Sequence, residues 1–144
     1  MNYQVLLSPG TIGPLRLKNR AVMVPMATDL ADRHGVVTDR QIRYYQERAK
    51  GGVGMIIEEY TGVDDIDSIP SIHNLRIARE YHVPEMEKLT DAVHMYDCKI
   101  AAQLHHAGAT SNPALTGRPN LAPSAVPIAP GKPVPQEMTK DDIH

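Results

Sequence analysis

The sequence predicts an α/β fold, the amino-terminal portion (about three βα units) of a (β/α)8 barrel, preceded by a β-hairpin. Short apolar runs typical of buried parallel strands occur at 21–24, 53–57 and 100–104, and helical periodicity separates them. A complete barrel takes roughly 250 residues, or about 31 per unit. The 144 residues therefore account for less than half of one, and we treat 1–144 as a single portion of one domain.

The first elements are a hairpin and a strand. Residues 8–18 place a Gly13-Pro14 turn between β-prone segments, which predicts a small hairpin that plugs the barrel. Residues 21–24 are continuously apolar, as expected of a strand buried on both faces. Pro25 ends that strand because proline has no N–H for the ladder.

Two helices are expected next. Thr38 and Gln41 have the spacing of a reciprocal capping box, and the helix should end at the Gly51-Gly52 pair. Its apolar stripe consists of Ile42, Tyr45 and Ala49. A second helix begins at Pro84, and its stripe consists of Met86, Leu89, Val93 and Tyr96.

The remaining segments are two loops and a helix start. Residues 62–81 form a mixed loop, and residues 105–135 hold seven of the twelve prolines, which predicts a long, semi-rigid loop. Thr139 to Asp142 resembles the cap and acidic first turn of another helix. Because that helix has almost no residues to continue into, we expect the chain to be truncated.

Composition excludes several classes of protein. A formal charge of -2 with mixed signs provides no basic face, which argues against nucleic acid and membrane surfaces as partners. The start of the chain lacks the basic flank and apolar length of a signal peptide, so we expect a cytoplasmic protein. Cys98, the single cysteine, is expected to be a small buried apolar residue.

Residues at the carboxyl ends of all three expected strands should share one rim, because parallel strands end at the same edge of a sheet. They are Ala27 with Thr28, Glu58 to Thr61, and Gln103 with His105 and His106. Backbone amides, imidazoles and the Gln103 amide would suit a planar heteroaromatic ring with alternating donors and acceptors. As a buried amide inside an apolar strand, Gln103 is expected to need partners.

Simpler interpretations stand beside this one. Adjacent His105 and His106 should point to opposite faces, so a shared metal ion, as in a metal-dependent hydrolase that also uses Glu58, is poorly supported and no metal site is expected. Glu58 and Glu59 could act as a general base, but carboxylates at a strand end are more often ion-paired or solvated.

Three motifs, in order and in register across the chain, resemble the amino-terminal part of the Old Yellow Enzyme family. They are LKNRAVMVPMAT, then VTDRQIRYYQERAKGGVGMIIEE, then QLHHAG with LAPSA. The family consists of NADH:flavin oxidoreductases with an FMN-bearing TIM barrel. Within this family, the sequence most resembles the branch of 2,4-dienoyl-CoA reductases and enoate reductases.

The resemblance implies a set of cofactor-binding residues: Pro25, Met26 and Ala27 through their backbone, Gln103 at the pyrimidine side of the flavin, and Tyr60 beside it. Many relatives carry Thr or Cys at the position of Ala27, so Thr28 is a candidate for tuning the flavin in its place. The family's frequent arginine after H-A-G is Ala109 here, and that contact is not carried over.

The resemblance also implies FMN as cofactor, NADH or NADPH as reductant, and an enone or enoyl-type substrate whose C=C bond receives a hydride through flavin N5. The catalytic residues, the phosphate-binding elements and the iron–sulfur cysteines of the large branch would lie beyond His144. No residue of this segment is therefore assigned a catalytic role. We expect this chain to be a truncated, inactive part of an enzyme that either associates with the missing barrel half or forms a homo-oligomer. The alternative is a non-catalytic half-barrel that self-associates through open sheet edges.

Overall fold

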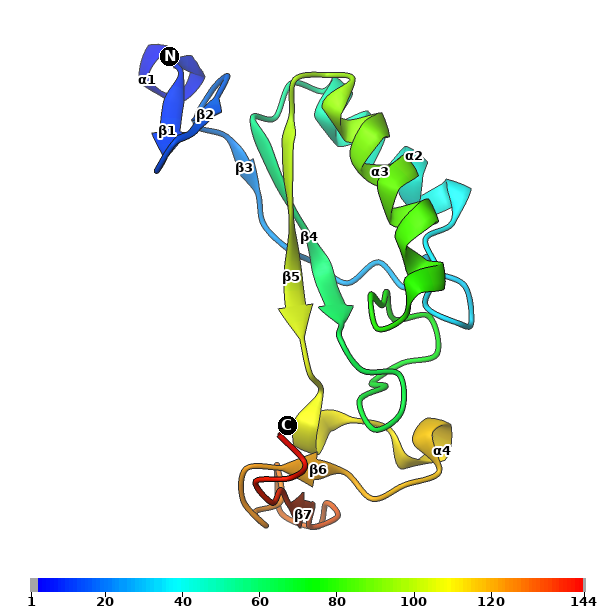
Figure 1. Cartoon of the computed structure of the whole chain (residues 1–144). Coiled ribbons are helices and arrows are strands. Elements are labelled where there is room, and N and C mark those ends of the chain that lie inside the picture. The colour runs from blue at the N-terminus through cyan, green and yellow to red at the C-terminus, as the bar shows by residue number, and fades with distance from the viewer. Residues whose placement is uncertain (1–2, 144) are drawn as a thin grey trace.

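A computed structural model describes residues 3–143 and contains a parallel sheet covered by helices on one face (Figure 1). The elements in chain order are α1 (Gln4–Leu7), β1 (Gly10–Ile12), β2 (Leu15–Leu17), β3 (Val22–Met23), α2 (Asp39–Lys50), β4 (Met55–Gly62), η1 (Glu80–His82), α3 (Val83–His94), β5 (Lys99–His105), η2 (Gly108–Thr110), α4 (Pro113–Thr116), β6 (Leu121–Ala122) and β7 (Gln136–Glu137).

The main sheet has the order β3-β4-β5, and both pairings are parallel. Its strands are connected through α2 and α3, which lie side by side on one face of the sheet (Figure 1). Antiparallel β1 and β2 form a hairpin ahead of the sheet. The predicted fold class, successive βα units preceded by a hairpin, is confirmed.

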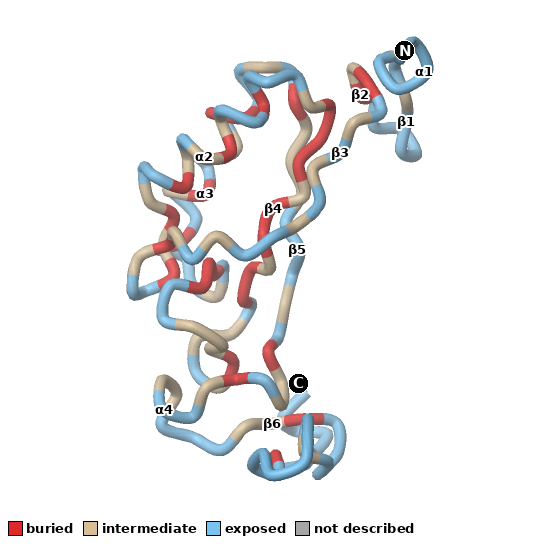
Figure 2. Tube along the Cα trace, turned by 180° about the vertical axis from the view of Figure 1, so that it is seen from behind, coloured by how far each residue is buried: buried red, intermediate tan, exposed pale blue. Residues whose placement is uncertain are grey.

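The core lies between the sheet and the two helices, where Figure 2 shows most of the buried segments. Tyr45 of α2, Ile56 of β4 and Leu89 of α3 are fully buried there. Cys98, just before β5, joins the same cluster and is confirmed as a small buried residue. The apolar stripes of both helices therefore pack into the core, as their spacing predicted.

The first strand differs from its prediction. β3 spans only Val22–Met23, and the expectation that residues 21–24 are buried on both faces is wrong: Val22 is 39 % exposed and Val24 is 61 % exposed. Within the described residues, β3 pairs with β4 on one side only, so it is an edge strand. The apolar run identified a strand but not how many neighbours cover it.

The second strand is longer than predicted. β4 continues to Gly62, so the residues expected after it, Glu58 to Thr61, lie within it. Its register with β5 shifts between Ile57 and Tyr60, where three steps of β4 match two steps of β5. This bulge explains why Glu58 and Glu59 are both buried, because an extra residue interrupts the alternation of faces.

Helix α2 begins as predicted, with one difference. The Thr38 hydroxyl accepts a hydrogen bond from the Gln41 N–H at 3.3 Å. The Gln41 side chain does not complete the reciprocal capping box, because it donates instead to the Glu59 carboxylate. Helix α3 carries Pro84 in its first turn, as expected.

Residues 105–135 are largely irregular, in agreement with their proline content, but the short elements η2, α4 and β6 interrupt them. β7 follows directly after this segment. Thr139 and Asp142 exchange capping hydrogen bonds, with the Asp142 carboxylate accepting from the Thr139 N–H at 2.6 Å and Thr139 Oγ1 accepting from the Asp142 N–H at 3.3 Å. Within residues 3–143, no helix is long and apolar enough to cross a membrane.

Asn19 anchors the start of the sheet to the turn before β4. Its side-chain amide donates to the Gly52 carbonyl at 2.7 Å, and its side-chain oxygen accepts from the Ala21 N–H at 3.1 Å. The turn approaches so closely that a Cβ placed on Gly54 would lie 2.6 Å from both the backbone oxygen and Oδ1 of Asn19. Only glycine fits this contact without displacing backbone.

We therefore expect Gly54→Ala to lower the free energy of unfolding by about 1–3 kcal/mol, the usual cost of overpacking. Urea denaturation would measure it. Gly10→Ala is the matched control, because a Cβ there meets only the flexible Arg20 side chain at 3.5 Å and should change little. Equal effects of the two substitutions would contradict the close approach at Gly54.

Candidate functional site

The polar rim predicted from the sequence forms at the carboxyl ends of β4 and β5. Tyr60 is paired in register with Gln103, and the Tyr60 and His105 rings lie 4.8 Å apart between centroids. Ile57 is paired with Ala101, two residues before Gln103. Paired residues of parallel strands share a face, so Tyr60, Gln103 and His105 lie on the face opposite the helices.

Gln103 is exposed, so the expectation of a buried amide is wrong. It lies on β5, which has no neighbour beyond it among the described residues. Nothing within residues 3–143 hydrogen-bonds its side chain, which leaves both a donor and an acceptor available. Beside it, His105 Nδ1 is buried without a hydrogen-bond partner in the described chain, and burial lowers the pKa of this imidazole.

The segment that follows β3 carries the other predicted residues. Pro25 is half-buried, and Met26 and Ala27 are exposed. The Thr28 hydroxyl and the Thr28 N–H both donate to Glu59, the N–H at 2.7 Å. The role of Thr28 in tuning a flavin stays a prediction, and its hydroxyl is already engaged by this carboxylate.

Glu59 is the centre of a buried hydrogen-bond network that sequence reasoning missed. Besides Thr28, its carboxylate accepts from the Gln41 amide and, at 3.4 Å, from the Tyr45 hydroxyl. The Glu59 N–H donates in turn to the Tyr45 hydroxyl at 2.9 Å. One carboxylate thus joins β4, helix α2 and the loop after β3. The bulge in β4 places Glu59 on the helix-covered face, and a bulge cannot be predicted from a strand pattern.

Glu58 occupies a different environment on the same face, where it lines an apolar cavity of about 80 Å³ with Met86 and Ile100. Burial raises the pKa of Glu58 to about 7, although the Thr61 hydroxyl donates to it at 3.2 Å. Both carboxylates are at most 2 % exposed, and neither has an ion pair within residues 3–143. The expectation that they are ion-paired or solvated is therefore wrong.

The two adjacent histidines separate, as their alternation predicted. His105 contacts Tyr60, whereas His106 Nε2 lies 3.5 Å from the Asp64 carboxylate. In the described part of the chain, no three His, Cys, Asp or Glu side chains lie close enough together to hold a metal ion.

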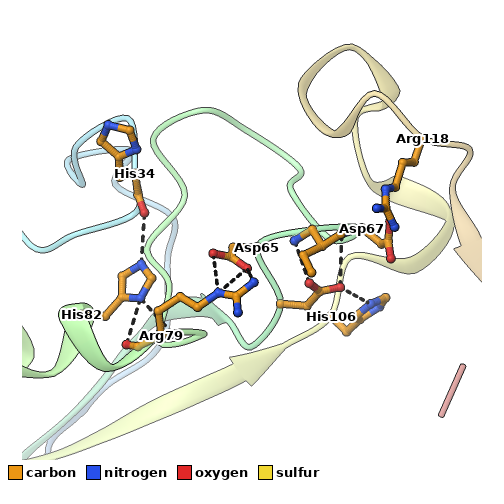
Figure 3. A network of polar contacts seen from close by, with 9 residues as sticks. His34, Asp65, Asp67, Arg79, His82, His106 and Arg118 are labelled. Atoms are coloured by element: carbon orange, nitrogen blue, oxygen red, sulfur yellow. Dashed lines mark hydrogen bonds and ion pairs between the residues drawn. The ribbon is translucent and has the colours of Figure 1, made fainter. Parts of the chain in front are cut away.

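Polar contacts with basic side chains hold the loop that follows β4 (Figure 3). Three aspartates of this loop each have a separate basic partner: Asp64 has His106, Asp65 has Arg79 at 2.7 Å, and Asp67 has Arg118 at 3.3 Å. The His82 ring also contacts the His34 carbonyl oxygen at 3.0 Å. The loops at this end of the sheet are therefore tied to one another.

Comparison with known proteins gives a consistent result. Residues 5–144 match the model of the NADH:flavin oxidoreductase / NADH oxidase family. The chain is 42 % identical over 144 residues to an NADH oxidase of Thermoanaerobacter brockii, covering 99 % of this chain and 22 % of the relative. It is 41 % identical over 141 residues to an NADPH dehydrogenase of Geobacillus thermodenitrificans, covering 97 % of this chain and 40 % of the relative.

Solved structures match the fold as well. A 2-naphthoyl-CoA reductase in complex with 2-naphthoyl-CoA superposes with a TM-score of 0.90 at 26 % identity, over 99 % of this chain and 24 % of that one. Old Yellow Enzyme from a Pichia species superposes with a TM-score of 0.87 at 29 % identity, over 96 % of this chain and 39 % of that one. The chain thus spans between a fifth and two fifths of the length of these proteins.

The Glu59 network predicts a large effect of a small substitution. Glu59→Gln preserves the size of the side chain but replaces one acceptor by a donor that faces other donors, and should cost about 2 kcal/mol of unfolding free energy. Urea denaturation would measure the loss. Glu87→Gln, at an exposed position of α3, should change stability by less than about 0.5 kcal/mol. Similar values for both variants would contradict the network.

Glu58 predicts a specific dependence of stability on pH. Because its pKa is raised from 4.5 to about 7 in the folded state, folding favours its protonated form. The contribution of Glu58 to the free energy of unfolding is fully present below about pH 4.5. It is lost as the pH rises through 7, and the total loss is about 3 kcal/mol. Unfolding measured from pH 4 to 8 should show this fall. It should be absent from Glu58→Gln and retained in Glu87→Gln; a fall retained in Glu58→Gln would contradict the assignment.

Proposed function

Because the chain belongs to the NADH:flavin oxidoreductase / NADH oxidase family, we propose that it forms one wall of the flavin site of an FMN-dependent ene-reductase. The family uses FMN, and its relatives include enzymes named for NADH and for NADPH. The observation that carries the proposal is the open rim, where the exposed Met26-Ala27 segment and the free Gln103 amide accompany the Tyr60–His105 pair.

The chemistry of this rim fits a flavin. An isoalloxazine ring presents alternating acceptors and donors at its pyrimidine edge, and the Gln103 side chain can both donate and accept. We propose that Gln103 binds that edge, that Pro25, Met26 and Ala27 line the ring through their backbone, and that Tyr60 and Thr28 complete this side. The buried, unpartnered Nδ1 of His105 is a further polar atom facing the same region.

When bound, FMN carries a hydride from NAD(P)H to an activated C=C bond. This chain's own residues would bind and orient the ring. The Glu59 network would keep the segment that contains Ala27 and Thr28 in place, because the carboxylate accepts both donors of Thr28. The structural relative bound to 2-naphthoyl-CoA supports a conjugated carbonyl compound, of the enone or enoyl type, as substrate.

We further propose that the 144 residues alone do not catalyse reduction and act within a longer barrel. The supporting observations are that β3 and β5 each have a neighbouring strand on one side only within the described residues, and that the chain covers only 22 % and 40 % of two relatives. We also infer a cytoplasmic location, which the single, buried and unpaired Cys98 supports.

A second candidate is a non-catalytic half-barrel that self-associates through its sheet edges. The exposed apolar residues Val22 and Val24 at one edge and Leu104 at the other favour it. Size-exclusion chromatography with light scattering distinguishes the two functions. A flavin-free oligomer of fixed size would support self-association, whereas flavin absorbance that elutes with the protein would support one wall of a flavin site.

The test of the flavin site is a titration of the flavin-free protein with FMN, followed by flavin fluorescence. Gln103→Leu should raise the dissociation constant about tenfold, the effect of losing about 1.4 kcal/mol of hydrogen bonding. Gln136→Leu, at an exposed position of β7, is the matched control and should leave FMN binding unchanged. An unchanged affinity in Gln103→Leu would overturn the assignment of this residue.

A further inference from the structure

Arg76 is a buried cation that has no ion-pair partner within residues 3–143. The residue is only 6 % exposed. Its Nη2 has one long contact, 3.5 Å to the Ile72 carbonyl oxygen, and its Nε has no partner in the described part of the chain. Removing a guanidinium from water without pairing it is costly, and arginine cannot lose its charge to avoid that cost.

The nearby acids do not supply the missing partner. Asp65 is paired with Arg79 in the network of Figure 3. Asp32 has one carboxylate oxygen committed to its own loop, where it accepts from the backbone N–H groups of His34 at 2.7 Å and Val36 at 2.9 Å. Arg76 is thus left without an ion-pair partner among residues 3–143.

The backbone holds Arg76 firmly in this position. Its N–H donates to the Gly35 carbonyl at 2.9 Å, and it forms an isolated parallel bridge with Gly62. The side-chain stem lies against both glycines: a Cβ on Gly35 would come within 2.6 Å of Arg76 Cγ, and one on Gly62 within 3.4 Å. Gly35 also has a φ of +80°, so two features favour glycine there.

A cavity of about 250 Å³ adjoins this side chain. Arg33, His34 and Arg76 supply its polar wall, and Ile69, Ile72 and Leu115 supply an apolar wall. Among the described residues that line it, none is acidic. A positive, acid-free pocket with an apolar side is suited to an anion that carries a short hydrocarbon body.

We propose that this cavity binds a small organic anion, a carboxylate or phosphate ester on a short apolar body, whose charged group pairs with Arg76. The planar guanidinium provides parallel donors for two oxygens of one anion. Arg33 and His34 stand at the same polar wall, and the hydrocarbon part lies against Ile72 and Leu115. This site is separate from the rim at Gln103, and it does not depend on a bound flavin.

Calorimetric titration of the protein with butyl phosphate, with butanoate and with 1-butanol tests the proposal. We expect at least one of the anions to bind and the neutral alcohol not to bind. Binding of butyl phosphate alone identifies a phosphoryl site, and binding of butanoate alone identifies a carboxylate site. If neither anion binds, or if butanol binds as well as they do, the proposal is wrong.

Two variants separate the site from general effects. Arg76→Met keeps a stem of similar shape between the two glycines and should weaken anion binding at least tenfold. Arg43→Met removes the same charge from an exposed position of α2 and should change it less than twofold. Anion affinity unchanged in Arg76→Met would overturn the proposal.

Leu115→Trp tests the same cavity without altering Arg76. The larger side chain should fill the space and weaken binding at least tenfold, so the test remains decisive if Arg76→Met fails to fold. FMN titration of Leu115→Trp should match the parent protein. If Leu115→Trp loses anion binding but keeps FMN binding, the result supports the anion site independently of the flavin site. If the parent protein itself does not bind FMN, only the flavin proposal is rejected.

Discussion

The buried carboxylate of Glu59 is the interaction on which the rim depends. Backbone pairing between strands would by itself attach the segment after β3 to the sheet through only two paired residues, Val22 and Met23. Glu59 adds acceptors for Thr28 and Gln41, so a loop, a strand and a helix converge on one group. In a low-dielectric interior such hydrogen bonds are strong, and each donor left unpaired is expensive. The geometry of the rim therefore follows from the interior beneath it.

The two faces of the sheet serve different purposes. The face under α2 and α3 is closed by apolar packing and by the Glu59 network (Figure 1). The opposite face carries Gln103, which is exposed. Rigidity on one side and accessible polar groups on the other are what a cofactor platform requires. The polar contacts of Asp64, Asp65 and Asp67 with basic side chains extend that rigidity to the loops at the carboxyl ends of the strands.

Much of the architecture could be predicted from local patterns. Helical spacing identified α2 and α3, glycine and proline identified the hairpin turn, and motif resemblance identified the family and therefore the barrel. Burial at the edges could not be predicted, because the exposure of Val24 and Gln103 depends on which strands are neighbours and not on their own residues. The partners of Glu59 were equally hidden, since they come from two segments, the loop after β3 and helix α2, that are distant from β4 in the sequence. The position of Arg76 between two glycines has no local signal at all.

The bulge in β4 has a consequence for comparing this chain with its relatives. Ile57 and Tyr60 share a face although an odd number of steps separates them, so the parity of inward and outward residues changes within one strand. A relative that lacked the extra residue would have regular pairing here, with two steps on each strand, and the residue aligned with Tyr60 would still face the same side as Ile57. Such a relative would lack a residue between these two positions, so it could not keep both Glu58 and Glu59. An insertion or deletion at this point therefore changes the buried polar groups between the sheet and the helices, even where sequence identity on either side is high.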